Sequence, residues 1–216
     1  IFPAYSEGDD IIVENQKFYF MRQQRAKDAV NGTHYCLSDF IAPKSANKQD
    51  HLGCFVVTAG PEIETWAKKL ENENDDYNSI LVKALGDRMA EALAEYAHKK
   101  VREIFGYGKT EDLTNAELIA EKYRGIRPAP GYPACPDHTA KFTLWEMLQV
   151  QERIGVKITE TAVMSPASSV SGFYFVHPES KYFHVGKIGD DQLKDMAKRR
   201  NEDVEFLEKW LAPQLI

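Results

Sequence analysis

A long uninterrupted apolar repeat constrains the fold of this chain more than any other feature. Large apolar residues recur at spacings of three to five across residues 76–105, where Gly86 is the only glycine and no proline occurs. The repeat consists of Tyr77, Leu81, Leu85, Met89, Leu93, Tyr96, Val101 and Ile104. This period predicts a single helix of roughly 45 Å. Gly106 and Gly108 follow it and are expected to end it.

Shorter elements are predicted on both sides of this helix. Thr114 and Glu117 have the spacing of a capping box, which starts a short helix to about Tyr123. Residues 124–137 contain four prolines and are expected to form an ordered loop. Strands are predicted at 11–13, 18–21, 52–58, 157–163, 172–176 and 181–185, with a turn at Asn15-Gln16, and further helices from Pro61 and at 139–155, 190–200 and 202–211.

The order of these elements favours an α+β fold in one domain. Strands come first, long helices follow, and strands and helices close the chain, without the regular alternation of a parallel sheet. The Gly-x-Gly-x-x-Gly pattern of doubly wound nucleotide-binding folds is absent.

Composition excludes several functional classes. The net charge of −6 argues against nucleic acid as a partner, because phosphates are held by clustered Lys and Arg. Cys36, Cys54 and Cys135 are widely spaced, which fits a reducing cytoplasm and predicts no disulfide framework. No stretch is apolar enough for a membrane span or an export signal. We expect a cytoplasmic monomer.

Sequence patterns for catalytic side chains are also missing. The six histidines are scattered and none has a partner at metal-ligand spacing, so no metal site is predicted. The serines at 168, 169 and 171 lack the preceding glycine of a nucleophile elbow. Gly108-Lys109-Thr110 resembles the end of a phosphate-binding loop, but Glu103 stands where that motif needs glycine. No catalytic residue is predicted.

The proline-rich loop is the most informative candidate site. A single guanidinium, Arg127, precedes a stiff backbone in which Gly131 permits close approach and Tyr132 offers a ring. Arginine grips a carboxylate through two hydrogen bonds. The loop is thus suited to a small ligand that has a carboxylate and a cation. On these residues alone, a loop that merely caps a helix is an equal alternative.

Five segments of the chain resemble one family. They are FPAYSEGDD (2–10), YCLSDFIAPK (35–44), the run from DDYNSIL to HKKVR (75–102), GIRPAPGYPACPDHTAKFTLWEML (125–148) and SVSGFYFVHPESKYF (169–183), followed by WLAPQL near the end. Together they resemble the activation domain of cobalamin-dependent methionine synthase, which binds S-adenosyl-L-methionine. The resemblance covers nearly all of the chain.

The resemblance implies a fold and a set of binding residues. The family's fold is a C-shaped single α+β domain with a twisted antiparallel sheet and long helices, so residues 1–216 are expected to be one such domain, without its N-terminal part. The family also uses an aspartate in a segment upstream of these residues. Arg127 would bind the methionyl carboxylate, the backbone around Ala129 and Gly131 nearby polar groups, Tyr132 would face the ligand, and Tyr182 and Phe183 would complete the groove from a neighbouring strand.

An acidic row on the long helix is a second candidate site. Asp87, Glu91 and Glu95 recur at a spacing of four and therefore share one face. Most such rows are solvated surface. The resemblance implies that Asp87 and Glu91 form an interface with the cobalamin-binding domain.

The resemblance also implies an activity. Cobalamin, held by a neighbouring domain, is oxidised occasionally to inactive cob(II)alamin, and one electron with a methyl group from S-adenosylmethionine restores methylcobalamin. Flavodoxin or a flavoprotein reductase would supply the electron. The domain would serve methionine biosynthesis as part of a methyltransferase without completing that reaction alone. The alternatives are a redox-partner docking module that does not bind S-adenosylmethionine productively, and an independent methyltransferase, for which no base is found.

Overall fold

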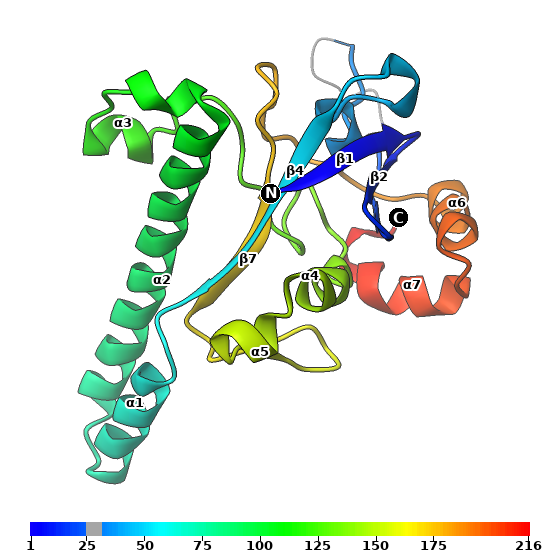
Figure 1. Cartoon of the computed structure of the whole chain (residues 1–216). Helices are drawn as coiled ribbons and strands as arrows, with labels where there is room; N and C mark the ends of the chain where they lie inside the picture. The colour runs from blue at the N-terminus through cyan, green and yellow to red at the C-terminus, as the bar shows by residue number, and fades with distance from the viewer. Residues whose placement is uncertain (25–31) are drawn as a thin grey trace.

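A five-stranded antiparallel sheet forms the centre of the molecule. The computed structural model describes residues 1–24 and 32–216. The strand order is β3-β2-β1-β4-β7, and β4 is the longest strand (Figure 1). The bounds are Phe2–Glu7 for β1, Asp10–Val13 for β2, Gln16–Tyr19 for β3, Asp50–Thr58 for β4 and Ser169–Tyr174 for β7. A separate two-stranded hairpin joins β5 (Lys157–Ile158) to β6 (Met164–Ser165).

The turn between β2 and β3 lies one residue earlier than its sequence indicates. Val13 pairs with Gln16, so the turn consists of Glu14 and Asn15. Glu14 has a left-handed backbone with φ of 52°. The prediction of a turn at Asn15-Gln16 was therefore wrong by one residue, because Gln16 already belongs to β3.

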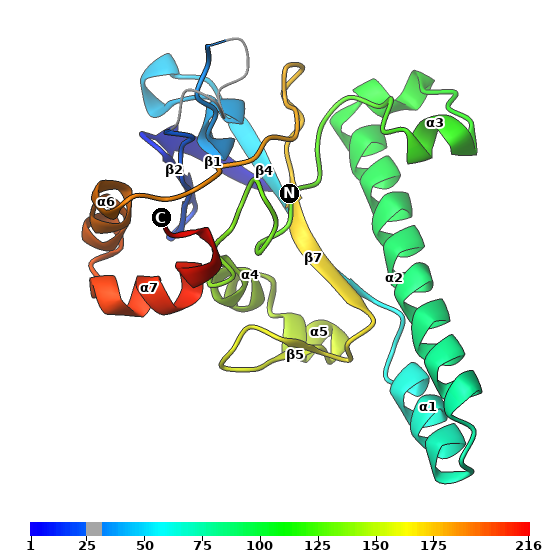
Figure 2. The same cartoon turned by 180° about the vertical axis from the view of Figure 1, so that it is seen from behind.

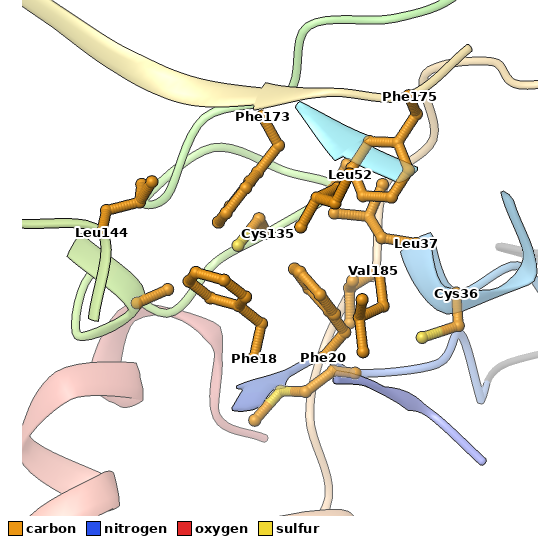
Figure 3. Packing of buried hydrophobic residues seen from close by; sticks show 14 of the residues in the cluster. Phe18, Phe20, Cys36, Leu37, Leu52, Cys135, Leu144, Phe173, Phe175 and Val185 are labelled. Carbon is orange, nitrogen blue, oxygen red and sulfur yellow. The ribbon is translucent and has the colours of Figure 1, made fainter. Parts of the chain in front are cut away.

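Aromatic residues fill the main core on one face of the sheet. Phe18 and Phe173 meet edge to face with ring centroids 5.0 Å apart, and Phe20 contacts both Phe173 and Phe175 (Figure 3). Leu144 of helix α4 (Ala140–Leu148) also belongs to this cluster. Edge-to-face pairs add roughly 0.5–1.5 kcal/mol each to the stabilisation from buried area. The other helices on this side are α6 (Asp190–Arg200) and α7 (Val204–Leu211), seen best in Figure 2.

Helix α2 (Asp76–Phe105) covers the opposite face of β4 and β7, and its bounds match the prediction. The Asp75 side chain accepts a hydrogen bond from the backbone N–H of Asn78 and caps the first turn. Gly106 ends the helix with φ of 93°. The preceding helix, α1 (Glu62–Asn72), packs beside the first half of α2 (Figure 1).

The buried face of α2 is made of small residues as far as Ala94 and then of His98 and Arg102, not of the large apolar residues whose spacing predicts the helix. Val82, Gly86, Ala90 and Ala94 face the rest of the molecule. A β-carbon at Gly86 would lie 2.6 Å from a methyl carbon of Ile63. This close approach excludes larger side chains. The large apolar residues of α2 that are exposed are Tyr77, Ile80, Leu81, Leu85, Met89, Leu93, Tyr96 and Ile104.

Four predicted elements were wrong in extent or type. The helix expected at 139–155 is broken at Gln149, whose φ is 51°, into α4 (Ala140–Leu148) and α5 (Val150–Ile154). The expected strand 181–185 is irregular, because the Val185 N–H bonds to the carbonyl of Pro133 in the loop, not to a strand. The strand expected at 157–163 is limited to β5. Helix α3 (Asn115–Ile119) has its capping box but ends before Tyr123.

These features define the fold class. A curled antiparallel sheet lies between α2 on one face and α4, α6 and α7 on the other, so the chain is α+β as expected. Four short 3-10 helices complete the elements of the described residues, at Leu37–Phe40, Lys44–Ala46, Tyr107–Thr110 and Ala212–Gln214. Among residues 1–24 and 32–216, no helix is long and apolar enough to cross a membrane.

Candidate functional site

Backbone hydrogen bonds order the proline-rich loop against β7. Ile126 and Phe175 exchange two N–H to carbonyl bonds of 2.9 and 3.0 Å, and the N–H of Phe173 donates to the carbonyl of Pro128 at 3.0 Å. Arg127 lies between these two anchored residues. The prolines stiffen the remainder of the loop, because they fix φ. The loop is therefore a preformed wall, as predicted, and holds Arg127 beside the sheet.

The loop borders a pocket of about 400 Å³. Of the six predicted binding residues, Arg127, Ala129, Tyr132, Tyr182 and Phe183 line this pocket. Its volume lies within the range of small-molecule sites. Glu121, which the sequence did not single out, also lines it and brings a carboxylate to the same space as the Arg127 guanidinium. The pocket thus combines both signs of charge with aromatic rings.

Three partners fix the position of Arg127. Its Nη2 donates to Oε2 of Glu95 at 3.0 Å, and its Nη1 lies 3.2 Å from Nδ1 of His98. Its backbone N–H donates to the hydroxyl of Tyr182 at 3.0 Å. A guanidinium has five N–H donors, so the contacts to Glu95 and His98 leave donors for a ligand. The side chain is oriented before any ligand arrives.

His98 is a neutral acceptor in this arrangement. Burial, followed by the charges of Arg102 and Arg127, lowers the pKa of His98 to about 3. A neutral ring that accepts at Nδ1 carries its proton on Nε2. The ring also stacks on Tyr174 with centroids 4.9 Å apart. His98 can therefore hold Arg127 without adding a competing positive charge.

Gly131 does not line the pocket. Its φ is 94°, which L side chains rarely adopt, and a β-carbon there would lie 2.0 Å from the His138 ring. Glycine is therefore required by the loop itself. Tyr132, the next residue, is 66% exposed at the pocket rim. The Tyr182 hydroxyl keeps its proton at neutral pH, because burial raises its pKa.

The acidic row on α2 leads toward the pocket. Asp87 accepts a hydrogen bond from Ser168 at 2.8 Å, and Glu91 pairs with Arg88 at 2.6 Å while remaining exposed. Glu95, the third member, pairs with Arg127. The sequence grouped Glu95 with surface charges and missed its part in the site. The sequence did not single out His98 either. Its only signal is the spacing of about one helical turn from Glu95, which places both side chains on the same face of α2.

The three thiols and the Ser169 hydroxyl lack the surroundings that would activate a nucleophile. No group of three metal-binding side chains lies among residues 1–24 and 32–216. Burial raises the pKa of Cys36 and Cys54 to about 12 and that of Cys135 well above its ordinary value, so none of these thiols is a thiolate at neutral pH. The Ser169 hydroxyl donates to the carbonyl of Pro166 and has no neighbouring base among its bonds.

Two comparisons with known proteins agree with this geometry. Residues 1–201 match the family model "Vitamin B12 dependent methionine synthase, activation domain". The fold matches a solved structure described as "Crystal Structure of the MetH Reactivation Domain bound to AdoHcy", with a TM-score of 0.95 and 49% sequence identity. That match covers 99% of this chain and 68% of the solved one. The chain therefore belongs to the activation domain family of vitamin B12-dependent methionine synthase.

Proposed function

We propose that this domain binds S-adenosyl-L-methionine in the pocket beside the proline-rich loop and presents its methyl group to the cobalamin of a neighbouring domain. The observation that carries this proposal is the oriented guanidinium of Arg127 at the pocket wall. The relative bound to AdoHcy supports it, because AdoHcy is S-adenosylmethionine without the transferred methyl group.

Different residues of the pocket bind different parts of the ligand. Arg127 takes the methionyl carboxylate through its remaining N–H donors. Glu121 is placed to balance the cationic end of the ligand, and the rings of Tyr132, Tyr182 and Phe183 contact the adenosine and the sulfonium. Backbone groups at Ala129 bind nearby polar atoms of the ligand. The ligand is thereby held with its methyl group in a fixed direction.

Positioning is the main contribution of these residues to methyl transfer. Cobalamin bound by its own domain and reduced by one electron would supply the nucleophile for the methyl group, and S-adenosylhomocysteine would remain in the pocket. The sulfonium is already an activated donor, so no acid or base is needed from this chain. Holding donor and acceptor in line converts an encounter of two molecules into a step within one complex.

The acidic row provides the contact with the neighbouring domain. Asp87 and Glu91 are exposed on the face of α2 that leads to the pocket. They would meet basic groups of the cobalamin-binding domain during reactivation. The electron comes from flavodoxin or a flavoprotein reductase. We also propose that residues 1–216 act as one monomeric domain in the cytoplasm, within the pathway of methionine synthesis.

Transfer of a labelled methyl group tests this function. The chain is mixed with S-adenosylmethionine, a one-electron reductant and the cobalamin-bearing remainder of the enzyme. Label should appear on cobalamin only when this chain is present. The chain alone should make no methionine from methyltetrahydrofolate and homocysteine. Docking of the reductase without transfer of label would instead favour a redox-partner module.

A further inference from the structure

One side chain at the ligand pocket has no partner among the residues that the structure describes. His184 lines the pocket of about 400 Å³ together with Arg127 and Tyr182. Its side chain is exposed and makes no hydrogen bond, ion pair or ring contact with residues 1–24 or 32–216. An imidazole ring has two nitrogens that form hydrogen bonds. His184 therefore brings two hydrogen-bonding groups to the pocket that the protein itself does not engage.

The neighbours of His184 determine the side to which its ring points. Phe183 and Val185 are 4% and 1% exposed and belong to the main core, in which Val185 is labelled (Figure 3). Tyr182 and His184 are exposed, so exposure alternates from Tyr182 to Val185, as in an extended segment. Successive side chains of an extended segment point to opposite sides. The rings of Tyr182 and His184 therefore point away from the core, to the side of the pocket that both line.

Hydrogen bonds on both sides of the peptide hold the backbone at His184. Its carbonyl accepts a hydrogen bond from Nε2 of Gln23 at 2.7 Å, and the N–H of Val185 donates to the carbonyl of Pro133 at 2.9 Å. Gln23 is buried, and its Oε1 accepts a hydrogen bond from the N–H of Tyr35 at 2.8 Å. Because the backbone is already ordered, a ligand that binds to the imidazole restricts little beyond the rotamers of one side chain.

Arg127 and His184 stand at different ends of the two segments that border the pocket. At one end, the N–H of Arg127 donates to the hydroxyl of Tyr182 at 3.0 Å. At the other end, Val185 is bonded to Pro133 of the loop. An extended chain advances by about 3.3 Å per residue, so His184 follows Tyr182 along the pocket by roughly 6–7 Å. In S-adenosylmethionine the adenosine lies at the end remote from the carboxylate. A ligand whose carboxylate is bound to Arg127 therefore directs its adenosine toward His184.

We propose that His184 binds the adenosine of the ligand through a hydrogen bond and is a specificity-determining residue of this pocket. The inference rests on the proposed function, because the carboxylate at Arg127 sets the direction of the ligand. The imidazole recognises a polar group of the nucleoside, which the methionyl chain does not carry. S-adenosylmethionine and S-adenosylhomocysteine share the nucleoside, so His184 contributes equally to the binding of both.

Two ligands and two variants separate the ends of the site. S-adenosylhomocysteine carries the carboxylate and the nucleoside, whereas 5′-methylthioadenosine carries the nucleoside alone. His184→Ala should weaken the binding of both ligands by the same factor, about threefold to tenfold, because a single hydrogen bond is lost. Arg127→Ala should weaken only the binding of S-adenosylhomocysteine. His177→Ala, which removes a histidine outside the pocket lining, is the matched control and should bind both ligands like the parent.

A third variant separates hydrogen bonding from packing. His184→Phe keeps an aromatic ring and loses both nitrogens, so it should bind as weakly as His184→Ala. Calorimetric titration gives the dissociation constants, and circular dichroism checks that each variant is folded. Unchanged affinity of folded His184→Ala for either ligand would overturn the role of His184, and so would full affinity of His184→Phe, because packing of a ring would then explain the loss. A parent that binds neither ligand would contradict the proposed function together with this inference.

Discussion

Arg127 and Glu95 form an ion pair of 3.0 Å that joins the proline-rich loop to the long helix α2. The two residues come from different elements and meet at the pocket wall. Their contact, with the hydrogen bond from Arg127 to His98, orients the guanidinium toward the ligand space.

Glu95 is expected to act by positioning Arg127. Glu95→Ala should weaken S-adenosylmethionine binding by about tenfold, roughly 1.4 kcal/mol. Glu95→Gln should restore most of this loss, because the amide oxygen still accepts a hydrogen bond from Nη2. Dissociation constants of the two variants decide the matter. Equal losses would mean that the charge of Glu95, not its hydrogen bond, supports binding.

The burial of His98 predicts a loss of stability in acid. The folded pKa of about 3 lies below the ordinary 6.5, so the unfolded chain takes up the proton first. The free energy of unfolding should therefore fall as pH drops below about 6.5, by up to about 1.4 kcal/mol per pH unit, down to about pH 3. Urea unfolding of the parent and of His98→Gln measures this. The parent should lose about 2 kcal/mol more than the variant between pH 7 and pH 5; the same loss in both proteins would refute the assignment.

Gly86 is predicted to be required for the close packing of α2. A β-carbon there would lie 2.6 Å from Ile63 and 2.7 Å from the Ser168 hydroxyl. Gly86→Ala should destabilise the protein by about 1–3 kcal/mol, although alanine favours helices by about 1 kcal/mol. Chemical denaturation gives the value. Stabilisation by this change would show that α2 can move away from Ile63 without cost. Ala84→Gly, on an exposed position, should cost only the loss in helix propensity.

Asp87 and Glu91 are predicted to matter only when the cobalamin domain is present. Asp87→Asn with Glu91→Gln should leave S-adenosylmethionine binding near normal and slow reductive methylation in the complete enzyme. Glu73→Gln, between α1 and α2, is the matched control and should have no effect. A native rate of methylation in the double variant would show that Asp87 and Glu91 are solvated surface residues without a role in the interface.

Local signals predicted the ends of α2 but not its orientation. Asp75 and Gly106 act through their own backbone neighbours, so a sequence can indicate both. Which face is buried depends on how closely α1 and the sheet approach the helix. Here contact with Ile63 at Gly86 selects small residues and leaves Met89 exposed. The break at Gln149 likewise has no glycine or proline to indicate it.

The candidate site could be predicted where a single segment supplies its residues. Arg127 and Tyr132 lie in the loop whose chemistry the sequence displays, and Tyr182 came from the resemblance. Glu95 and Glu121 join the site only because the fold brings α2 and the end of α3 to the loop. Gly131 was expected near the ligand, and its place is set instead by His138.

Calorimetric titration of this chain with S-adenosylmethionine tests the central claim most directly. The parent should bind one equivalent. Arg127→Ala should bind roughly 30- to 150-fold more weakly, about 2–3 kcal/mol, because a hydrogen-bonded charge pair is lost. Arg124→Ala, in the same loop but not in the pocket lining, should bind like the parent, and circular dichroism should show all three folded. Unchanged affinity in a folded Arg127→Ala protein, or no binding by the parent, would contradict the account.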